Sequence, residues 1–464
     1  MACVAAVAAT PVQGTSDNQA SHLALIRAFS GATTQIDRYA MTTDDKVRFR
    51  GHFYSNKAPG LALASLPAYA AFEAAGGPAA SRRVAQRSRD RDRGTTWAVG
   101  LAGAVLPALA VLLLVQRLGD RIEPGRGAAA AVTLGLATLL LPFSTMLFAH
   151  ALSALLAFTA FAALWREREG EQRLLLVAAA GLAAGLAVST EYTLAVVAFV
   201  LGIYAVLRDR ETRSAIRRAA AFAGGAAAGV VPLLAYNALA FGSPLHVSYD
   251  GVEAQSAGLF GVRPPRPDIG LDIMVGHKGL LVMSPVLVAA VAGVALMARR
   301  GLRAEAFTIA GVAGALLLVN AGFYLDDGAP GAPDHPFGGF SPGPRLLVPM
   351  LPFLALGLAC AYRRAPLLTA LLAVFSAARV MLATLTEPLV DQDTGVWWDR
   401  LAANDFTATV FTQLLGGNGW PTVTPVLVLA AAAAALAIVA ARKAGAARSR
   451  ESHALTGHTQ RGVR

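Results

Sequence analysis

Continuous runs of apolar residues, each roughly 15–22 residues long, recur along the chain between polar segments. At a rise of 1.5 Å per residue, a helix of that length crosses a hydrocarbon core of about 30 Å. The strands of an outer-membrane barrel would instead alternate apolar and polar residues. The pattern predicts an all-α, polytopic transmembrane helical bundle of about 11–12 spans. The runs cover residues 96–116, 127–145, 148–165, 173–189, 193–207, 219–241, 279–298, 305–323, 346–361, 367–385 and 424–441.

Two further apolar stretches do not read as simple spans. Residues 1–12 are too short to cross a membrane and are typical of the end of a first transmembrane helix. They lack the charged segment and the cleavage site of a secretory signal. Residues 58–77 contain Pro59, Pro67, Glu73 and paired glycines. We predict that this second stretch forms an interfacial or re-entrant helix.

The composition agrees with a membrane protein. Of the 464 residues, 55% are hydrophobic and 15% are charged, and the mean hydropathy is +0.52. A soluble domain has about 45–50% apolar and about 25% charged residues, so a soluble enzyme and a disordered chain are excluded. The two cysteines lie in apolar segments, where neither a disulfide framework nor a thiolate metal site is expected. Abundant Ala, Gly, Val and Arg favour a bacterial source, and hence the bacterial inner membrane.

The net charge of +11 arises from basic loops, which the positive-inside rule places in the cytoplasm rather than against nucleic acid. The clusters lie at alternate ends of the spans, at residues 208–218, 299–303, 363–364 and 442–464. The longer loops then face outside, at residues 242–278, 324–345 and 386–422. Loop 78–94 carries six arginines, and an outer interfacial helix at 58–77 keeps the later clusters inside. We expect one membrane domain over 1–441 and a disordered, basic cytoplasmic tail over 442–464.

The first outer loop, residues 13–57, is the richest in polar side chains. Ser16 or Asp17 can cap a short amphipathic helix. Its apolar face would lie on the membrane surface and consists of Leu23, Leu25, Ile26 and Phe29. Asp17 would stand at the start of this helix, directly after the first span, either as a reactive carboxylate or as a simple helix cap.

A lysine follows in the segment GHFYSNKAP, residues 51–59, which opens the apolar stretch 58–77. Lys57 therefore lies at the level of the lipid head groups, where its ammonium suits a phosphate. The alternative is an ordinary interfacial lysine whose apolar stem covers apolar surface.

Other ionisable residues stand at or near the ends of predicted spans. His150 and Glu191 are functional candidates because ionisable groups at membrane depth are costly, although each could simply face water at a helix end. Lys278 precedes a span, and Arg345 lies in a Gly-Pro-Arg turn where its guanidinium could bind a phosphate in a bidentate manner. Two aspartate pairs could bind a divalent cation, but adjacent loop aspartates are more often solvated: Asp44 with Asp45, and Asp326 with Asp327.

The sequence lacks a Walker loop, a Gly-rich dinucleotide turn, a zinc-protease motif and a nucleophile elbow. A transferred group would therefore arrive on a lipid carrier. Asp17-Asn18 precedes the amphipathic segment Gln19–Ser30, and the turn Tyr54-Ser55-Asn56-Lys57-Ala58-Pro59-Gly60 follows some thirty residues later. This pattern resembles the GT-C superfamily of polyprenyl-phosphate-sugar-dependent glycosyltransferases, in the branch of protein O-mannosyltransferases and lipid A aminoarabinose transferases.

The resemblance implies a bundle of the GT-C type, with Asp17 as general base and Lys57 as a ligand of the carrier phosphate. Arg345 is assigned to the phosphate by role alone. Further substrate-binding candidates are Asn18, Tyr54, His150, Glu191 and Lys278. Asn18 replaces the second acidic residue of the family motif, and a shift of one position would put Asn18 in the place of the base. No metal ligand is assigned, although Mg or Mn is an allowed cofactor.

The chemistry of a sugar on a polyprenyl phosphate leads to the same hypothesis. Cations at the outer interface stabilise the departing phosphate, and a carboxylate removes the proton of the acceptor hydroxyl. Attack opposite the leaving group inverts the anomeric centre. The sequence identifies neither the sugar nor the acceptor, which could be protein, lipid or polysaccharide. The alternatives are a transporter or flippase of a lipid-linked saccharide, and a catalytically inactive subunit of an envelope-polymer assembly.

Overall fold

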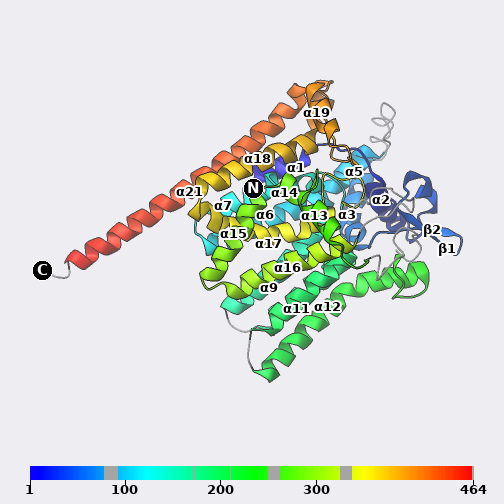
Figure 1. Cartoon of the computed structure of the whole chain (residues 1–464). Helices are drawn as coiled ribbons and strands as arrows, with labels where there is room; N and C mark the ends of the chain where they lie inside the picture. The colour runs from blue at the N-terminus through cyan, green and yellow to red at the C-terminus, as the bar shows by residue number, and fades with distance from the viewer. Residues whose placement is uncertain (78–91, 171–172, 209–210, 249–261, 324–336, 462–464) are drawn as a thin grey trace.

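A computed structural model describes residues 1–77, 92–170, 173–208, 211–248, 262–323 and 337–461 (Figure 1). The described chain is a bundle of helices with one two-stranded sheet at one end. Six helices in this part of the chain are long and apolar enough to cross a membrane, and a bent pair of helices allows a seventh. Three of the six are single helices, Thr212–Phe241 (α12), Arg303–Gly322 (α16) and Pro366–Leu385 (α18), and a fourth is Trp420–Ala444 within α21. The other two are composite: Arg93–Ile122 consists of α5 (Arg93–Gly100), η2 (Leu101–Val105) and α6 (Leu106–Ile122), and Arg345–Arg364 consists of η6 (Arg345–Met350) and α17 (Leu351–Arg364).

Two predicted spans are broken rather than continuous. Residues 127–145 form two helices, α7 (Gly127–Leu136) and α8 (Leu140–Ser144). Residues 279–298 belong to a pair, Pro267–Met283 and Val286–Arg299, bent by 89°. Pro142 and Pro285 account for the breaks, because proline has no backbone N–H to donate to the carbonyl oxygen four residues earlier in a helix. The bent pair comprises α13 (Pro267–Val275), α14 (Leu280–Met283) and α15 (Val286–Arg299).

The other predicted spans correspond to single helices. They include α9 (His150–Glu169), α10 (Leu174–Thr190) and η3 (Tyr192–Leu194) with α11 (Ala195–Val206). Additional elements are α1 (Ala2–Ala9), α2 (Asp17–Ser30), η1 (Asp37–Thr42), β1 (Lys46–Phe49), β2 (His52–Ser55), α3 (Gly60–Ala74), α19 (Gly395–Ala402) and α20 (Val410–Leu415). At 15 residues, α3 is shorter than the hydrocarbon core is thick.

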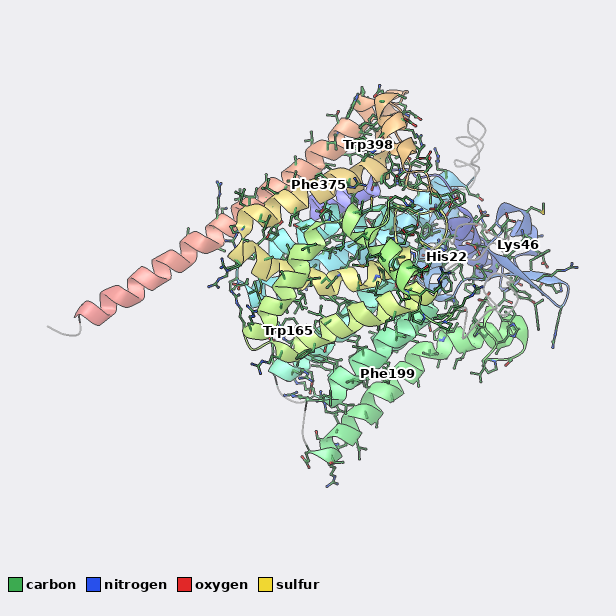
Figure 2. The ribbon with its side chains drawn as sticks, in the orientation of Figure 1. His22, Lys46, Trp165, Phe199, Phe375 and Trp398 are labelled. Atoms are coloured by element: carbon green, nitrogen blue, oxygen red, sulfur yellow. The ribbon has the colours of Figure 1, made fainter. Side chains whose placement is uncertain are left out.

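The bundle packs closely in its interior and is apolar on its outside. Trp165 is buried, whereas Phe199 and Phe375 are exposed on the surface (Figure 2). Exposed large apolar side chains are what a lipid-facing surface requires. Helices α10 and α12 approach closely through glycines: a Cβ on Gly181 would lie 2.1 Å from the carbonyl oxygen of Phe222. Small residues at such contacts allow transmembrane helices to pack backbone to backbone.

The structure corrects two predictions, one for the amphipathic helix α2 and one for the C-terminal tail. Ser16 caps α2 by accepting the N–H of Gln19 at 3.4 Å, as predicted. Leu23, Leu25 and Ile26 are fully buried against other parts of the protein. The apolar face of α2 therefore packs inside the protein and does not lie on the membrane surface. The C-terminal helix α21 (Trp420–Arg461) continues through most of the predicted disordered tail. Alanine and arginine, both strong helix formers, dominate the first part of that tail and extend the helix.

The arginine clusters predicted to lie in the cytoplasm gather at one end of the bundle, where buried glutamates bind them. Glu123 contacts Arg300 and Arg363 between the ends of α6, α15 and α17. Glu167 on α9 binds Arg208 at 2.7 Å and Arg218 at 2.6 Å. The hairpin of β1 and β2, with α2 and α3, lies at the opposite end (Figure 1).

Replacing Glu167 by Gln should destabilise the protein by about 3–5 kcal/mol, because two guanidinium groups would lose their buried carboxylate. Glu169→Gln, in an exposed pair with Arg121 at 3.0 Å, is the matched control and should cost less than about 1 kcal/mol. Equilibrium unfolding in mixed micelles measures both. Equal losses of unfolding free energy in the two variants would show that the buried Glu167 cluster stabilises the protein no more than an exposed ion pair does.

Candidate functional site

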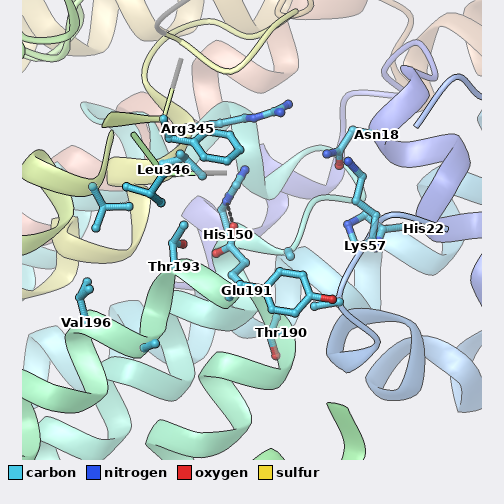
Figure 3. A pocket seen from close by; sticks show the side chains of 17 residues that line it. Asn18, His22, Lys57, His150, Thr190, Glu191, Thr193, Val196, Arg345 and Leu346 are labelled. Carbon is cyan, nitrogen blue, oxygen red and sulfur yellow. Dashed lines mark ion pairs between the residues drawn. The ribbon is translucent and has the colours of Figure 1, made fainter. Parts of the chain in front are cut away.

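A cavity of about 380 Å³ opens at the hairpin end of the bundle (Figure 3). Its walls come from α2, the turn after β2, the start of α9, the end of α10 with η3 and α11, the end of α16, and the start of η6. Lys57, His22 and Asn18 lie on one side, His150 and Glu191 lie across from them, and Arg345 comes from a third direction (Figure 3). The cavity is lined by Asn18, His22, Lys57, Ala58, Ala149, His150, Thr190, Glu191, Tyr192, Thr193, Ala195, Val196, Val262, Val319, Phe323, Arg345 and Leu346.

The hairpin and one glycine contact position Lys57. Phe49 pairs with His52 across a two-residue turn, Arg50-Gly51, in which both residues have positive φ. The hairpin returns the chain to Lys57, whose backbone N–H donates to the Ser55 hydroxyl at 3.1 Å. The start of α3 then presses against the end of α10: a Cβ on Gly60 would lie 2.4 Å from the Thr190 hydroxyl oxygen. This close approach brings Lys57 to the same cavity as the residue that follows Thr190.

Lys57 is buried and forms an ion pair with Asp45 at 2.8 Å. Burial lowers the pKa of Lys57 below its ordinary value, while the charge of Asp45 opposes that effect. Burial acts to raise the pKa of Asp45, but the ammonium of Lys57 prevails and holds it at about 2. The expectation of a merely solvated aspartate pair is therefore wrong for Asp45, although Asp44 is exposed. The cavity therefore contains a buried lysine that is paired with a carboxylate.

The ionisation of Asp45 should stabilise the fold over a wide pH range. Its pKa is depressed in the folded state, so its contribution is fully present above the unfolded pKa of about 3.9 and is lost as the pH falls through about 2. We expect the difference in melting temperature between the wild type and Asp45→Asn to stay constant from pH 8 to pH 5 and to shrink below pH 4. Asp44→Asn is the exposed control. A difference that already shrinks between pH 7 and pH 5 would contradict the assigned ion pair.

Arg345 reaches the cavity because Gly338 leaves room for it. Gly338 has a φ of +80°, and a Cβ there would lie 2.6 Å from Nε of Arg345. The guanidinium lies 6.0 Å from the ring centroid of Phe148. Lys278, in contrast, does not line the cavity. Its buried ammonium donates to the carbonyls of Ser341 and Val390, each at 3.1 Å, and also to that of Asp391. Lys278 thus ties the loop that presents Arg345 to the loop that follows α18.

His150 and Glu191 come together at the facing ends of α9 and α10. Nδ1 of His150 lies 2.5 Å from Oε1 of Glu191, and the Ser153 hydroxyl donates to the second carboxylate oxygen. The imidazole packs against Phe143 and Phe148, with ring centroids 5.0 and 5.7 Å away. Its Nε2 is buried and has no hydrogen-bond partner among the described residues. Nδ1 therefore contacts the carboxylate as an ion pair, and neither ring nitrogen makes a hydrogen bond within the described residues.

Helix α2 contributes two residues one helical turn apart, Asn18 and His22. Gln19 fixes this face, because its side-chain oxygen accepts the N–H of Leu147, three residues before His150, at 3.1 Å. Burial, reinforced by the charge of Lys57, lowers the pKa of His22 to about 3. His22 is consequently neutral at physiological pH, and its buried Nδ1 has no hydrogen-bond partner within the described part of the chain.

Comparison with known proteins places the fold. No protein-family model and no curated protein matches the sequence. The crystal structure of ArnT from Cupriavidus metallidurans in the apo state aligns over 95% of this chain and 72% of that chain, with a TM-score of 0.52 and 14% sequence identity. This chain therefore shares the fold of that structure. The oligosaccharyltransferase of Archaeoglobus fulgidus in the apo form aligns over 84% of this chain and 54% of that chain, with a TM-score of 0.43 and 12% identity.

Besides Lys278, two residues named from the sequence lie outside the cavity lining. Asp17 is exposed, and its carboxylate accepts the backbone N–H of Asp44 at 2.7 Å. Tyr54 is buried and packs on Phe241, with ring centroids 5.2 Å apart. The role of Asp17 as base therefore stays a prediction from the resemblance, whereas Asn18 beside it does line the cavity.

Among the described residues, no group of three or more His, Cys, Asp or Glu side chains lies close enough to hold a metal ion. Asp326 and Asp327 lie outside the described residues. The sequence reasoning missed His22 as a cavity residue and Asp45 as the ion-pair partner of Lys57. The hairpin offered a signal for Asp45. Asp45 directly precedes β1 and Lys57 lies two residues after the end of β2, so antiparallel pairing of the strands brings the two residues close together.

Proposed function

We propose that this protein transfers a sugar from a polyprenyl-phosphate donor to an acceptor hydroxyl at the outer face of a bacterial inner membrane. The observation that carries the proposal is the convergence of Lys57 and Arg345, distant in sequence, on one cavity of a GT-C fold. In the same cavity His150 and Glu191 supply a candidate proton acceptor. Fold alone does not define an activity, so the proposal rests on these side chains.

The two cations match the leaving group. Departure of a polyprenyl phosphate leaves negative charge on the phosphate, and preorganised cations in a water-poor site stabilise that charge as it develops. Arg345 offers a planar fork for two phosphate oxygens, and Lys57 offers a compact point charge. Arg345 and Lys57 line the same cavity, so the two cations can act on one anion.

The opposite wall of the cavity suits the lipid portion of the donor. Val196 comes from α11, and Val319 and Phe323 come from the end of α16. An amphipathic donor needs both surfaces, because its phosphate requires cations and its isoprenoid chain requires apolar contacts. The cavity provides cations on the α2 and η6 sides and apolar side chains on the α11 and α16 sides.

His150 is the proton acceptor that the geometry favours. In the proposed step the acceptor oxygen attacks the anomeric carbon, the new glycosidic bond forms, and the bond from that carbon to the phosphate oxygen breaks. The hydroxyl proton passes to Nε2 of His150, and Glu191 at 2.5 Å stabilises the resulting imidazolium. The phosphate leaves with the bonding electron pair toward Lys57 and Arg345, and the configuration inverts. Asp17 is the competing candidate for the base.

The distribution of charge supports an outer location. α9 begins at His150 and ends near Arg166 and Arg168, and η6 and α17 together run from Arg345 to Arg364. The cavity therefore lies at the ends of helices whose other ends carry the arginine clusters. Since basic clusters favour the cytoplasm, the cavity faces away from it.

Incubating purified protein in vesicles with a panel of radiolabelled polyprenyl-phosphate sugars and membrane acceptors tests the proposal. We expect label to pass to a new product, with release of polyprenyl phosphate. A flippase would move the labelled lipid across the bilayer with the sugar–phosphate bond intact. That outcome, or complete inertness with every donor of the panel, would refute the proposed transfer.

A further inference from the structure

A second cavity lies at the arginine end of the bundle, far along the helices from the first. Its volume is about 540 Å³, and helices α7, α17, α18 and α21 form its walls. Most of its lining is apolar, with many alanines, and two arginines stand among the lining residues. The lining consists of Arg126, Ala129, Val132, Thr133, Leu136, Ala137, Tyr362, Pro366, Ala370, Ala373, Val374, Ala377, Ala434, Ala437, Ile438, Ala441 and Arg442.

The cleft has a polar end and an apolar end. Arg126 directly precedes α7, and Arg442 lies on α21 directly after the last apolar lining residue of that helix. Along α7, the lining residue Ala137 lies eleven residues after Arg126. Along α18, Ala377 lies eleven residues after Pro366. At 1.5 Å per residue this is about 16 Å, close to half of the roughly 30 Å hydrocarbon core. The cleft thus has about the depth of one leaflet.

Its rim is exposed on the outside of the bundle. Val374 on α18 and Ile438 on α21 are 69% and 54% exposed, so the cleft opens toward the surface that faces lipid. Helix α21 packs on α7 and α1 rather than closely on α18. Lipid can therefore enter the gap between α18 and α21 from the side.

The two arginines differ from their neighbours at this end of the bundle. Arg300 and Arg363 bind Glu123, whereas neither Arg126 nor Arg442 has a carboxylate partner among the described residues. Two guanidinium groups without a carboxylate, at the mouth of an apolar cleft one leaflet deep, match an anionic head group above an acyl chain.

We propose that this cleft binds an anionic phospholipid of the cytoplasmic leaflet, with its phosphate at Arg126 and Arg442 and an acyl chain between α18 and α21. Basic residues beside apolar grooves between transmembrane helices recognise anionic lipids by this combination of charge and apolar contact. The site is separate from the proposed donor site and does not depend on the proposed function.

Native mass spectrometry of the full chain, released from nanodiscs of equal phosphatidylglycerol and phosphatidylcholine, tests the proposal. Each arginine should contribute about a fivefold preference for the anionic lipid, so Arg126→Gln with Arg442→Gln should lower that preference by roughly 25-fold. The matched control is Arg299→Gln with Arg303→Gln, which removes the same charge at the same end outside the cleft, and it should keep the preference. Retention of phosphatidylglycerol by the Arg126/Arg442 double variant would overturn the proposal.

A second variant separates the cleft from surface charge. Ala373→Trp fills the apolar part of the cleft and leaves both arginines in place. We expect this variant to retain at least fivefold less phosphatidylglycerol than the wild type, while eluting as a folded monodisperse protein. Unchanged retention would mean that the lipid binds the arginines on the surface alone, and the proposed cleft site would be wrong.

Discussion

Replacing Lys57 by Ala should lower kcat/KM for the proposed sugar transfer by about 10²–10³-fold, the usual effect of removing one charge-stabilising donor from a water-poor site. Lys57 is buried beside the cavity, and Arg345 alone would then face the charge that develops on the leaving phosphate. Because both the bound donor and the transition state carry phosphate charge, KM should rise and kcat should fall. Initial rates with the radiolabelled donor, together with binding of polyprenyl phosphate, measure the two effects separately.

Two variants control this experiment. Arg48→Ala removes an exposed cation from the same hairpin, outside the cavity, and should leave the rate unchanged. Lys57→Ala also leaves Asp45 buried without its partner, which could unfold the hairpin. The double variant Lys57→Ala with Asp45→Ala removes both charges, and it should remain inactive although its fold is preserved. A folded double variant with wild-type donor binding would show that Lys57 does not hold the phosphate.

The sequence predicted the helices well because membrane insertion imposes a strong and simple pattern. Apolar runs located α9, α10, α16 and α18 to within four residues at each end. Helix α12, in contrast, begins at Thr212 rather than at the predicted residue 219, and α13 lies in the predicted loop 242–278. The breaks at residues 137–139 and 284–285 were missed, although Pro142 and Pro285 signalled them locally. The burial of the apolar face of α2 could not be predicted, since an amphipathic helix has the same pattern on a membrane and on a protein core.

The site was predictable only where helix ends determine it. His150, Glu191 and Arg345 converge because each stands at an end of a span on the same face. Asp45 and His22 escaped prediction because their places depend on the hairpin register and on the rotation of α2 about its axis. The same rotation turns Asn18 toward the cavity while Asp17 is exposed. A one-residue uncertainty in a motif becomes a difference of about 100° around a helix.

Replacing His150 by Gln should lower kcat by about 10²–10⁴-fold, the typical contribution of a positioned general base. The glutamine fills similar space but cannot take up the acceptor proton. Glu191→Gln should also lower kcat with little change in KM, because the amide cannot stabilise the imidazolium that forms 2.5 Å away. His52→Gln is the matched control, since His52 is an exposed histidine of the hairpin paired with Asp37. Single-turnover rates with saturating donor isolate the chemical step.

The same measurement on Asp17→Asn decides between the two candidate bases. Asp17 accepts the N–H of Asp44 at 2.7 Å, an interaction that the asparagine oxygen can retain, so this variant should fold and bind donor normally. If His150 is the base, Asp17→Asn keeps a rate close to that of the wild type. An inactive Asp17→Asn beside an active His150→Gln would reverse the assignment, because α2 would then have to turn its first carboxylate into the cavity when substrate binds. Donor binding by Lys57 and Arg345 would stand in either case, since it depends on neither base.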